Sequence, residues 1–136
     1  MVALVATTTG SVSAAAEKET SLLVIVTSEN AEVQGMAMVL SRHSLMKGAG
    51  VQILLCGPAG DMALTGSPQV ALKPRGMTPQ GMLTGLIADC VQVEVCALYL
   101  PNREKQPDDL IDGVGVAKPP AIADAMLAAN TRLFTF

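Results

Sequence analysis

The sequence predicts an α/β domain, a three-layer α/β/α sandwich with about five mostly parallel strands. Two continuous apolar runs, Leu22–Val26 (LLVIV) and Val51–Leu55 (VQILL), are typical of strands that are buried on both faces. Between them, Ala31–Lys47 has the apolar spacing of an amphipathic helix. A strand, helix and strand of these lengths form a right-handed parallel crossover.

Composition limits the domain count and the kinds of chemistry. The chain has 136 residues, of which 50% are hydrophobic, so it fits one domain whose core needs no disulfide. A net charge of −3 without a basic stripe argues against nucleic-acid binding. The single histidine, His43, excludes multi-histidine metal sites, and the three cysteines match no zinc spacing. We therefore predict no metal and no cofactor, and we expect any chemistry to use sulfur.

The first 20 residues differ from the rest. Residues 1–16 (MVALVATTTGSVSAAA) carry no charged side chain and end in small residues, as the second half of a secretory leader does. The alternative is a disordered, low-complexity tail. The apolar run is too short to span a membrane. A cleaved leader would place the protein in the periplasm, and without one the protein would be cytoplasmic.

The first strand and helix are the clearest elements. Leu22–Val26 is expected at the centre of the sheet. The helix over Ala31–Lys47 has Asn30 as its N-cap and ends before Gly48. Its expected core face consists of Val33, Met36, Ala37, Leu40 and Ser44, which leaves His43 in solvent.

The second half repeats the alternation of helices and strands. Ala59–Gly76 is rich in Gly and Pro and is expected to be a long excursion with a short helix near Asp61–Leu64. Thr78 and Pro79 open a helix that reaches Asp89, with an apolar stripe of Met82, Leu83, Leu86 and Ile87. The remaining expected elements are strands at Val91–Val95, Gly113–Val116 and Thr131–Phe136, and a helix that opens at Pro119 and carries Ile122, Met126 and Leu127.

The carboxyl ends of the predicted strands carry the candidate site, because ligand crevices of open α/β sheets form there. Thr27 and Ser28 follow the first strand, Cys56 and Gly57 follow the second, and Cys96 follows the third. Side chains alternate along Val91–Val95, so Cys96 is expected on the polar face with Gln92 and Glu94. Lys73 or Arg75 could favour its thiolate.

The three cysteines have different expected roles. Cys90, at a helix end, is expected to be a buried small hydrophobe. Cys56 is either a core residue or part of the crevice. Cys96 is the candidate for reactivity, and a Cys56–Cys96 disulfide is possible if their strands are neighbours. The methionines could suggest soft-metal binding, but their spacing fits helix cores better.

Segments along the whole of Ser21–Phe136 resemble the DsrE-like family, most specifically VEVCALYLPN, the acidic DDLIDG stretch and the closing LFTF. The resemblance implies a Rossmann-like domain that assembles into homotrimers or hexamers. In its characterised branches a cysteine, which falls on Cys96 here, accepts and passes on a persulfide sulfur. Cys56 is not a signature of the family.

Two functional hypotheses follow. In the first, the protein is a sulfur carrier: the Cys96 thiolate takes a sulfane sulfur from a donor and gives it to a partner protein's thiol. Thr27, Ser28, Gly57 and Tyr99 would shape the pocket and donate hydrogen bonds to the sulfur, and Cys56 could be a resolving thiol. In the second, the protein is a non-catalytic oligomer that binds a small ligand or a protein, and Cys96 only lines a pocket.

Overall fold

The structure is a computed structural model that describes residues 19–136. The leader or tail expected at the amino terminus lies almost wholly in residues 1–18, outside the described range.

Five parallel strands form one sheet in the order β4-β3-β2-β1-β5. The strands are β1 (Ser21–Val26), β2 (Gly50–Leu55), β3 (Gln92–Val95), β4 (Val114–Val116) and β5 (Thr131–Thr135). All five were predicted within one or two residues. β1 is an interior strand, but the middle of the sheet is β2 and not β1 as expected. The reason is that the last strand returns to the far side of β1 and the two strands after β2 extend the sheet the other way.

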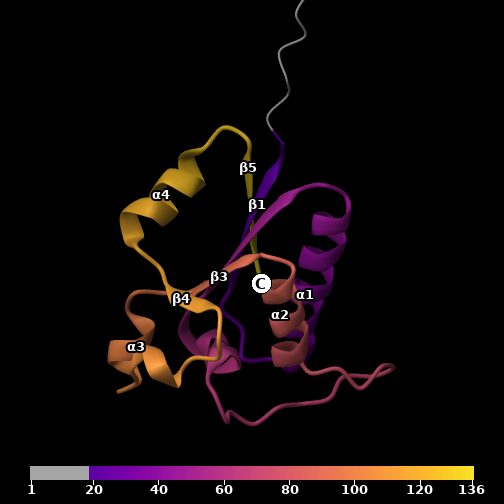
Figure 1. The fold of residues 1–136 in the computed structure, drawn as a ribbon, viewed down its shortest axis with the longest axis vertical. Helices are drawn as coiled ribbons and strands as arrows, with labels where there is room; N and C mark the ends of the chain where they lie inside the picture. The colour runs from indigo at the N-terminus through magenta and orange to yellow at the C-terminus, as the bar shows by residue number, and fades with distance from the viewer. Residues whose placement is uncertain (1–18) are drawn as a thin grey trace, which may run out of the picture.

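The helices lie on both sides of this sheet, which confirms the three-layer architecture (Figure 1). α1 (Ala31–Met46) and α2 (Pro79–Ala88) pack side by side on one face, and α4 (Pro119–Leu127) covers part of the other. The short helix α3 (Tyr99–Asn102) and the 3-10 helices η1 (Gly57–Ala63) and η2 (Pro107–Asp109) belong to the connections that follow β2 and β3. In Figure 1 these connections lie at the lower end, where the central strands finish.

Local sequence signals explain where the two long helices begin. The Asn30 side chain accepts hydrogen bonds from the backbone N–H groups of Glu32 (2.9 Å) and Val33 (3.2 Å). The Thr78 hydroxyl accepts one from Gly81 N–H at 3.0 Å. These bonds satisfy donors that a helix leaves without intrahelical partners, and both N-caps were predicted.

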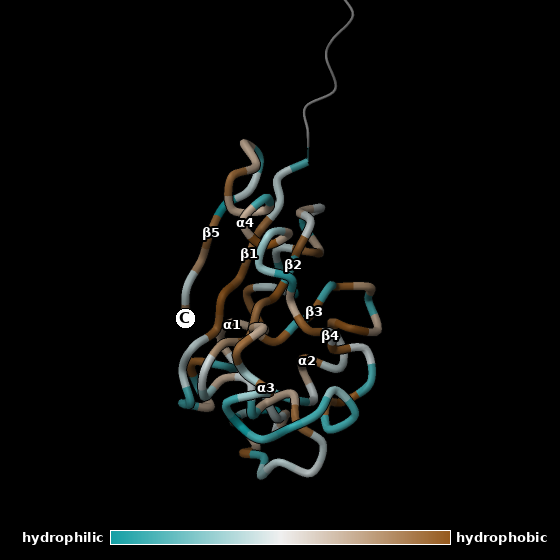
Figure 2. The backbone as a smooth tube through the Cα atoms, turned by 90° about the vertical axis from the view of Figure 1, so that its left-hand side faces the viewer, coloured by the Kyte–Doolittle hydropathy of each residue, from teal (hydrophilic) through white to brown (hydrophobic). Residues whose placement is uncertain are grey.

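The sheet divides the core into two parts. The larger cluster joins the Val24 and Val26 side of the sheet to α1 and α2, and the smaller one joins Leu23 and Leu54 to Ala117 and Ile122. Figure 2 shows the same distribution along the chain, with hydrophobic residues concentrated in the strands and hydrophilic residues in the loops at the lower end. On the face of the smaller cluster, Leu23 and Leu54 are buried, while Leu133 on β5 is 47% exposed.

The core face of α1 differs from the prediction. Its buried residues are Gln34, Gly35, Ala37, Met38 and Ser41. Met36 and Leu40, expected in the core, are 52% and 47% exposed. Gly35 lies so close to the Leu72 side chain that a Cβ would overlap it. Small residues therefore decide which face approaches the rest of the protein, and apolar residues around most of the helix hid this in the sequence.

Another expectation about burial is wrong. Cys90 is exposed, with a backbone φ of +65°, because it follows the last turn of α2 and the chain reverses there at the surface. On α4 only Ile122 is buried, while Met126 and Leu127 are exposed, because the smaller core cluster contacts one side of this helix.

Candidate functional site

Backbone hydrogen bonds between neighbouring strands continue past their carboxyl ends. Cys56 N–H donates to Val26 O and Cys96 N–H donates to Leu55 O, both at 2.9 Å. Ala117 N–H donates to Val95 O at the same distance. Since Leu55 is paired with Val95 in the sheet register, the two cysteines occupy adjacent positions one residue further along. The sheet thus fixes both cysteine backbones.

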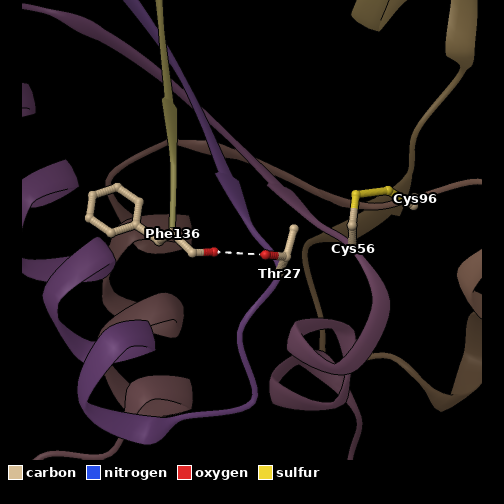
Figure 3. The surroundings of a disulfide bond; sticks show 4 residues. All are labelled: Thr27, Cys56, Cys96 and Phe136. Carbon is tan, nitrogen blue, oxygen red and sulfur yellow. Dashed lines mark hydrogen bonds between the residues drawn. A yellow bond between two sulfur atoms is a disulfide. The ribbon is translucent and has the colours of Figure 1, made fainter.

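Cys56 and Cys96 form a disulfide bond, with their Cα atoms 5.2 Å apart (Figure 3). The sequence left this pairing open. Both residues are half-buried. Cys56 packs against the smaller core cluster, and Cys96 contacts both clusters. The arrangement is a cysteine pair that can exist as a disulfide or as two thiols in reach of each other.

The predicted alternation along β3 is confirmed. Val93 and Val95 are buried in the larger cluster, whereas Glu94 is on the opposite face. The Glu94 carboxylate accepts a hydrogen bond of 3.1 Å from the side-chain amide of Gln52 on β2. Cys96 therefore continues the less buried, polar-containing face, as its position in the sequence suggested.

Tyr99, three residues after Cys96, makes a polar contact that the sequence did not predict. Its ring is buried, and its hydroxyl donates a 2.7 Å hydrogen bond to Oδ1 of Asp61 in η1. Arg103 lies 3.5 Å from Oδ2 of Asp61, and its guanidinium is 5.6 Å from the centre of the Tyr99 ring. Burial, and then the hydrogen bond to Asp61, raise the pKa of Tyr99 well above its usual value.

This group of residues links the two segments that leave the cysteines. Asp61 lies five residues after Cys56, and Tyr99 lies three residues after Cys96. A Cβ on Gly60 would overlap the Tyr99 ring, so the ring packs directly on the η1 backbone. We call Gly60, Asp61, Tyr99 and Arg103 the tyrosine clamp. It holds η1 and α3 together independently of the disulfide.

The hydroxyl protons of Thr27 and Tyr99, expected to reach the reactive sulfur, bond to other acceptors. Thr27 Oγ1 donates to Phe136 O at 3.0 Å, and in Figure 3 the Thr27 hydroxyl points toward Phe136. The Tyr99 proton is donated to Asp61.

Ser28 Oγ accepts from Asn30 N–H at 3.1 Å, at the start of α1. Gly57, with a φ of +54°, follows Cys56 directly and makes the sharp turn into η1. Of the predicted group, the structure brings together Cys56, Gly57 and Cys96.

Lys73 and Arg75, considered as promoters of a thiolate, are exposed in the connection before α2. His43 is exposed on α1, as predicted.

Among residues 19–136, no three His, Cys, Asp or Glu side chains are grouped as a metal site would need. Over the same range, no helix combines the length and apolar character required to cross a bilayer.

Two hollows in the described part of the protein are lined by neither cysteine of the disulfide. A small cleft of about 190 Å³ near the carboxyl ends of β1 and β2 is lined by Glu29, Gln34 and Asp61, among others. A larger groove of about 420 Å³ lies between α1 and β5, and we call it the α1/β5 groove. Its lining includes the apolar residues Val24, Leu40, Phe134 and Phe136 and the basic residues Lys47 and Arg132. The sequence predicted a crevice at the edge of the sheet where the small cleft lies, but not which residues line it. It gave no indication of the α1/β5 groove, which depends on residues from distant segments.

The fold is similar to that of two solved structures. The YchN protein from E. coli has a TM-score of 0.66 and 22% sequence identity, over 86% of this chain and 99% of its own. MTH1491, a protein of unknown function from Methanobacterium thermoautotrophicum, has a TM-score of 0.67 and 13% identity, over 87% of this chain and 100% of its own. No family model and no curated protein sequence matches the chain. At these identities the likeness establishes the fold alone: this is an α/β domain with the DsrE/YchN-like fold.

Proposed function

We propose that the protein is a sulfur carrier that holds a persulfide on Cys96. The observation that carries the proposal is the Cys56–Cys96 pair at the carboxyl ends of two adjacent parallel strands, half-buried and within disulfide reach. This edge of an open α/β sheet is where ligands commonly bind. Cysteines in such a position, unlike those inside the core, are accessible to small sulfur compounds.

In the reduced protein, the Cys96 thiolate attacks the outer sulfur of a sulfane donor such as thiosulfate or polysulfide. A bond forms between Cys96 Sγ and that sulfur, and the bond from that sulfur to the rest of the donor breaks. The leaving group departs with the electron pair, as sulfite in the case of thiosulfate. An acceptor thiolate, on a partner protein, later removes the outer sulfur from Cys96 in the same way.

Cys56 limits the lifetime of this persulfide. Because its backbone is fixed beside that of Cys96, its thiolate can attack Cys96 Sγ, displace the outer sulfur as hydrosulfide and form the disulfide. The sulfur adduct is therefore expected to accumulate when Cys56 is replaced and to be short-lived in the wild type. This gives Cys56 the role of a resolving thiol.

A second candidate is a non-catalytic binding oligomer, in which the disulfide only joins the β2 and β3 loops. The apolar side chains that are exposed at the surface favour it: Leu40 on α1 and Phe134 on β5 are each 47% exposed. Assembly into a trimer or hexamer that covers the α1/β5 groove is proposed under either function. Light scattering on the purified protein tests that assembly.

Location in the periplasm is part of the proposal. A stable disulfide is common in oxidising compartments and rare in the cytoplasm, and the leader-like residues 1–16 are consistent with export. Sequencing the mature amino terminus of protein from its native host tests this. A terminus at or near Glu17 supports export, and an intact Met1 in the fully processed protein contradicts it.

Intact mass spectrometry tests the carrier function. All variants carry Cys90→Ser, since Cys90 is an exposed thiol outside the site. The Cys56→Ser protein, incubated with thiosulfate or polysulfide, should gain about 32 Da, one sulfur atom. Cys96→Ser should gain nothing. If Cys96 stays unmodified with every donor, the carrier function is wrong and the binding oligomer is favoured.

A further inference from the structure

We propose that the disulfide form of the site is itself a sulfur acceptor, and that its substrate is inorganic hydrosulfide. This inference rests on the proposed function, because it assigns the retained sulfur to Cys96. Hydrosulfide attacks Cys96 Sγ, and a new S–S bond forms between them. The Cys56–Cys96 bond breaks, and Cys56 leaves with the electron pair as a thiolate that takes up a proton. The disulfide is the oxidant, so no other is needed.

The first requirement is that the cysteines stay in place after their bond breaks. Hydrogen bonds from Cys56 N–H to Val26 O and from Cys96 N–H to Leu55 O belong to the sheet and do not depend on the disulfide. The tyrosine clamp adds a second connection through the 2.7 Å bond between Tyr99 and Asp61. The persulfide and the Cys56 thiol therefore remain neighbours, and the step is reversible in place.

The second requirement is that a small nucleophile reaches the sulfur atoms more easily than a large one. Both cysteines are half-buried, and Cys56 contacts an apolar cluster that includes Leu54 and Ile122. Hydrosulfide contains one heavy atom. A peptide thiol such as glutathione must bring charged and polar groups against this apolar surface, and desolvating them is costly. The geometry thus favours inorganic sulfide as the attacking species.

The same equilibrium links the two redox forms of the site. Read forward, the disulfide and hydrosulfide give a Cys96 persulfide and a Cys56 thiol. Read backward, a Cys96 persulfide is discharged by Cys56 as hydrosulfide. Sulfide can therefore load Cys96 only when Cys56 is present and joined to Cys96 in the disulfide, because the disulfide is the oxidant. Sulfane donors, in contrast, load Cys96 without Cys56.

The test uses the oxidised protein with Cys90→Ser, free of other oxidants, and one equivalent of sodium sulfide without oxygen. Because Cys56 returns the persulfide to the disulfide, iodoacetamide is present from the start and alkylates both products as they form; the trapped chains should carry one added sulfur and two alkyl groups. Trypsin separates Cys56, on residues 48–75, from Cys96, on residues 76–103, and the extra sulfur should be on the second peptide. Sulfur on the Cys56 peptide, or a dithiol without added sulfur, would overturn the inference.

Two comparisons complete the test. Cys56→Ser with sulfide alone should gain no sulfur, because a thiol and sulfide are at the same oxidation level; an adduct there would mean that the disulfide is not the acceptor. The oxidised protein should react at least about tenfold faster with sulfide than with glutathione when folded, and this preference should shrink in denaturant. If the rate ratio of sulfide to glutathione is the same in the folded and the denatured protein, the apolar surroundings of the disulfide do not select sulfide.

The two proposals fail separately. If Cys56→Ser takes sulfur from thiosulfate or polysulfide while the oxidised protein does not take it from sulfide, the carrier function stands and this inference is wrong. If neither protein gains sulfur, both are wrong.

Discussion

The hydroxyl of Tyr99 donates a 2.7 Å hydrogen bond to Oδ1 of Asp61, and this bond connects the segments that follow the two cysteines. Asp61 is in η1, directly after Cys56, and Tyr99 begins α3, shortly after Cys96. The ring is buried, and Arg103 contacts both members of the pair. The loops of the candidate site are therefore held by a polar contact as well as by a covalent one.

The first prediction concerns the pH dependence of stability. The pKa of Tyr99 is raised in the folded state, mainly by burial and then by the hydrogen bond to Asp61. The Tyr99 hydroxyl ionises near pH 10 in the unfolded chain but stays protonated at that pH in the folded protein. Tyr99 therefore stabilises the fold below pH 10, and this stabilisation is lost as the pH rises further. Tyr99 is the only tyrosine, so phenolate absorbance reports it directly. Absorbance should appear together with unfolding, and Tyr99→Phe should lose less stability between pH 9 and 11. Ionisation in the folded protein near pH 10 would contradict this.

The second prediction concerns the close contact between Gly60 and the Tyr99 ring. A Cβ at position 60 overlaps the ring, so Gly60→Ala should destabilise the protein by about 1–3 kcal/mol in urea unfolding. Gly85 in α2 is the matched control, since a Cβ there meets no atom within 4 Å. Gly85→Ala should be neutral or stabilise the fold by about 0.5–1 kcal/mol. Equal effects of both substitutions would argue against the packing described for the tyrosine clamp.

The third prediction concerns the stability that the disulfide provides. It joins positions 40 residues apart, and closing a loop of this size in the unfolded chain corresponds to about 3–4 kcal/mol. Reduction should lower the free energy of unfolding of the wild type by this amount. A reductant should have no effect on Cys56→Ser, and Cys90→Ser should behave like the wild type. If the oxidised and reduced proteins unfold at the same urea concentration, the disulfide is not part of the native fold.

The fourth prediction concerns assembly through the α1/β5 groove. Phe134 lines the groove and is 47% exposed, so Phe134→Asp should convert a trimer or hexamer to a smaller species in light scattering. Leu127 on α4 is 85% exposed and does not line the groove, so Leu127→Asp is the matched control. A monomeric wild type at micromolar concentration would contradict the proposed assembly.

The sequence predicted the strands and long helices well because their signals are local. The LLVIV run, the Asn30 and Thr78 caps and the alternation of Val93 and Val95 each act within a few residues. The position of β1 in the sheet was predicted less well, because the strand order depends on which edge of the sheet the last strand joins. The core face of α1 was predicted correctly at Ala37 but wrongly at Met36 and Leu40, because Gly35 and Ser41 allow a close approach that a hydrophobic pattern does not register.

The candidate site could be predicted only in part. Strand ends placed Cys56 and Cys96 at one edge of the sheet, but their bond depends on the neighbouring register of β2 and β3. Asp61 gave no signal, because its partner Tyr99 is 38 residues away in the sequence. Thr27 was assigned to the pocket from its position, yet its hydroxyl bonds to Phe136, which lies 109 residues further along.

The most direct test of the central claim is the amount of transferable sulfur on Cys96. Protein with Cys56→Ser and Cys90→Ser is loaded with polysulfide, freed of small molecules and treated with cyanide, which removes sulfane sulfur as thiocyanate. We predict about one thiocyanate per chain, and none from the protein that also carries Cys96→Ser. No thiocyanate from the loaded protein, or equal amounts from both, would contradict a sulfur carrier that works through Cys96.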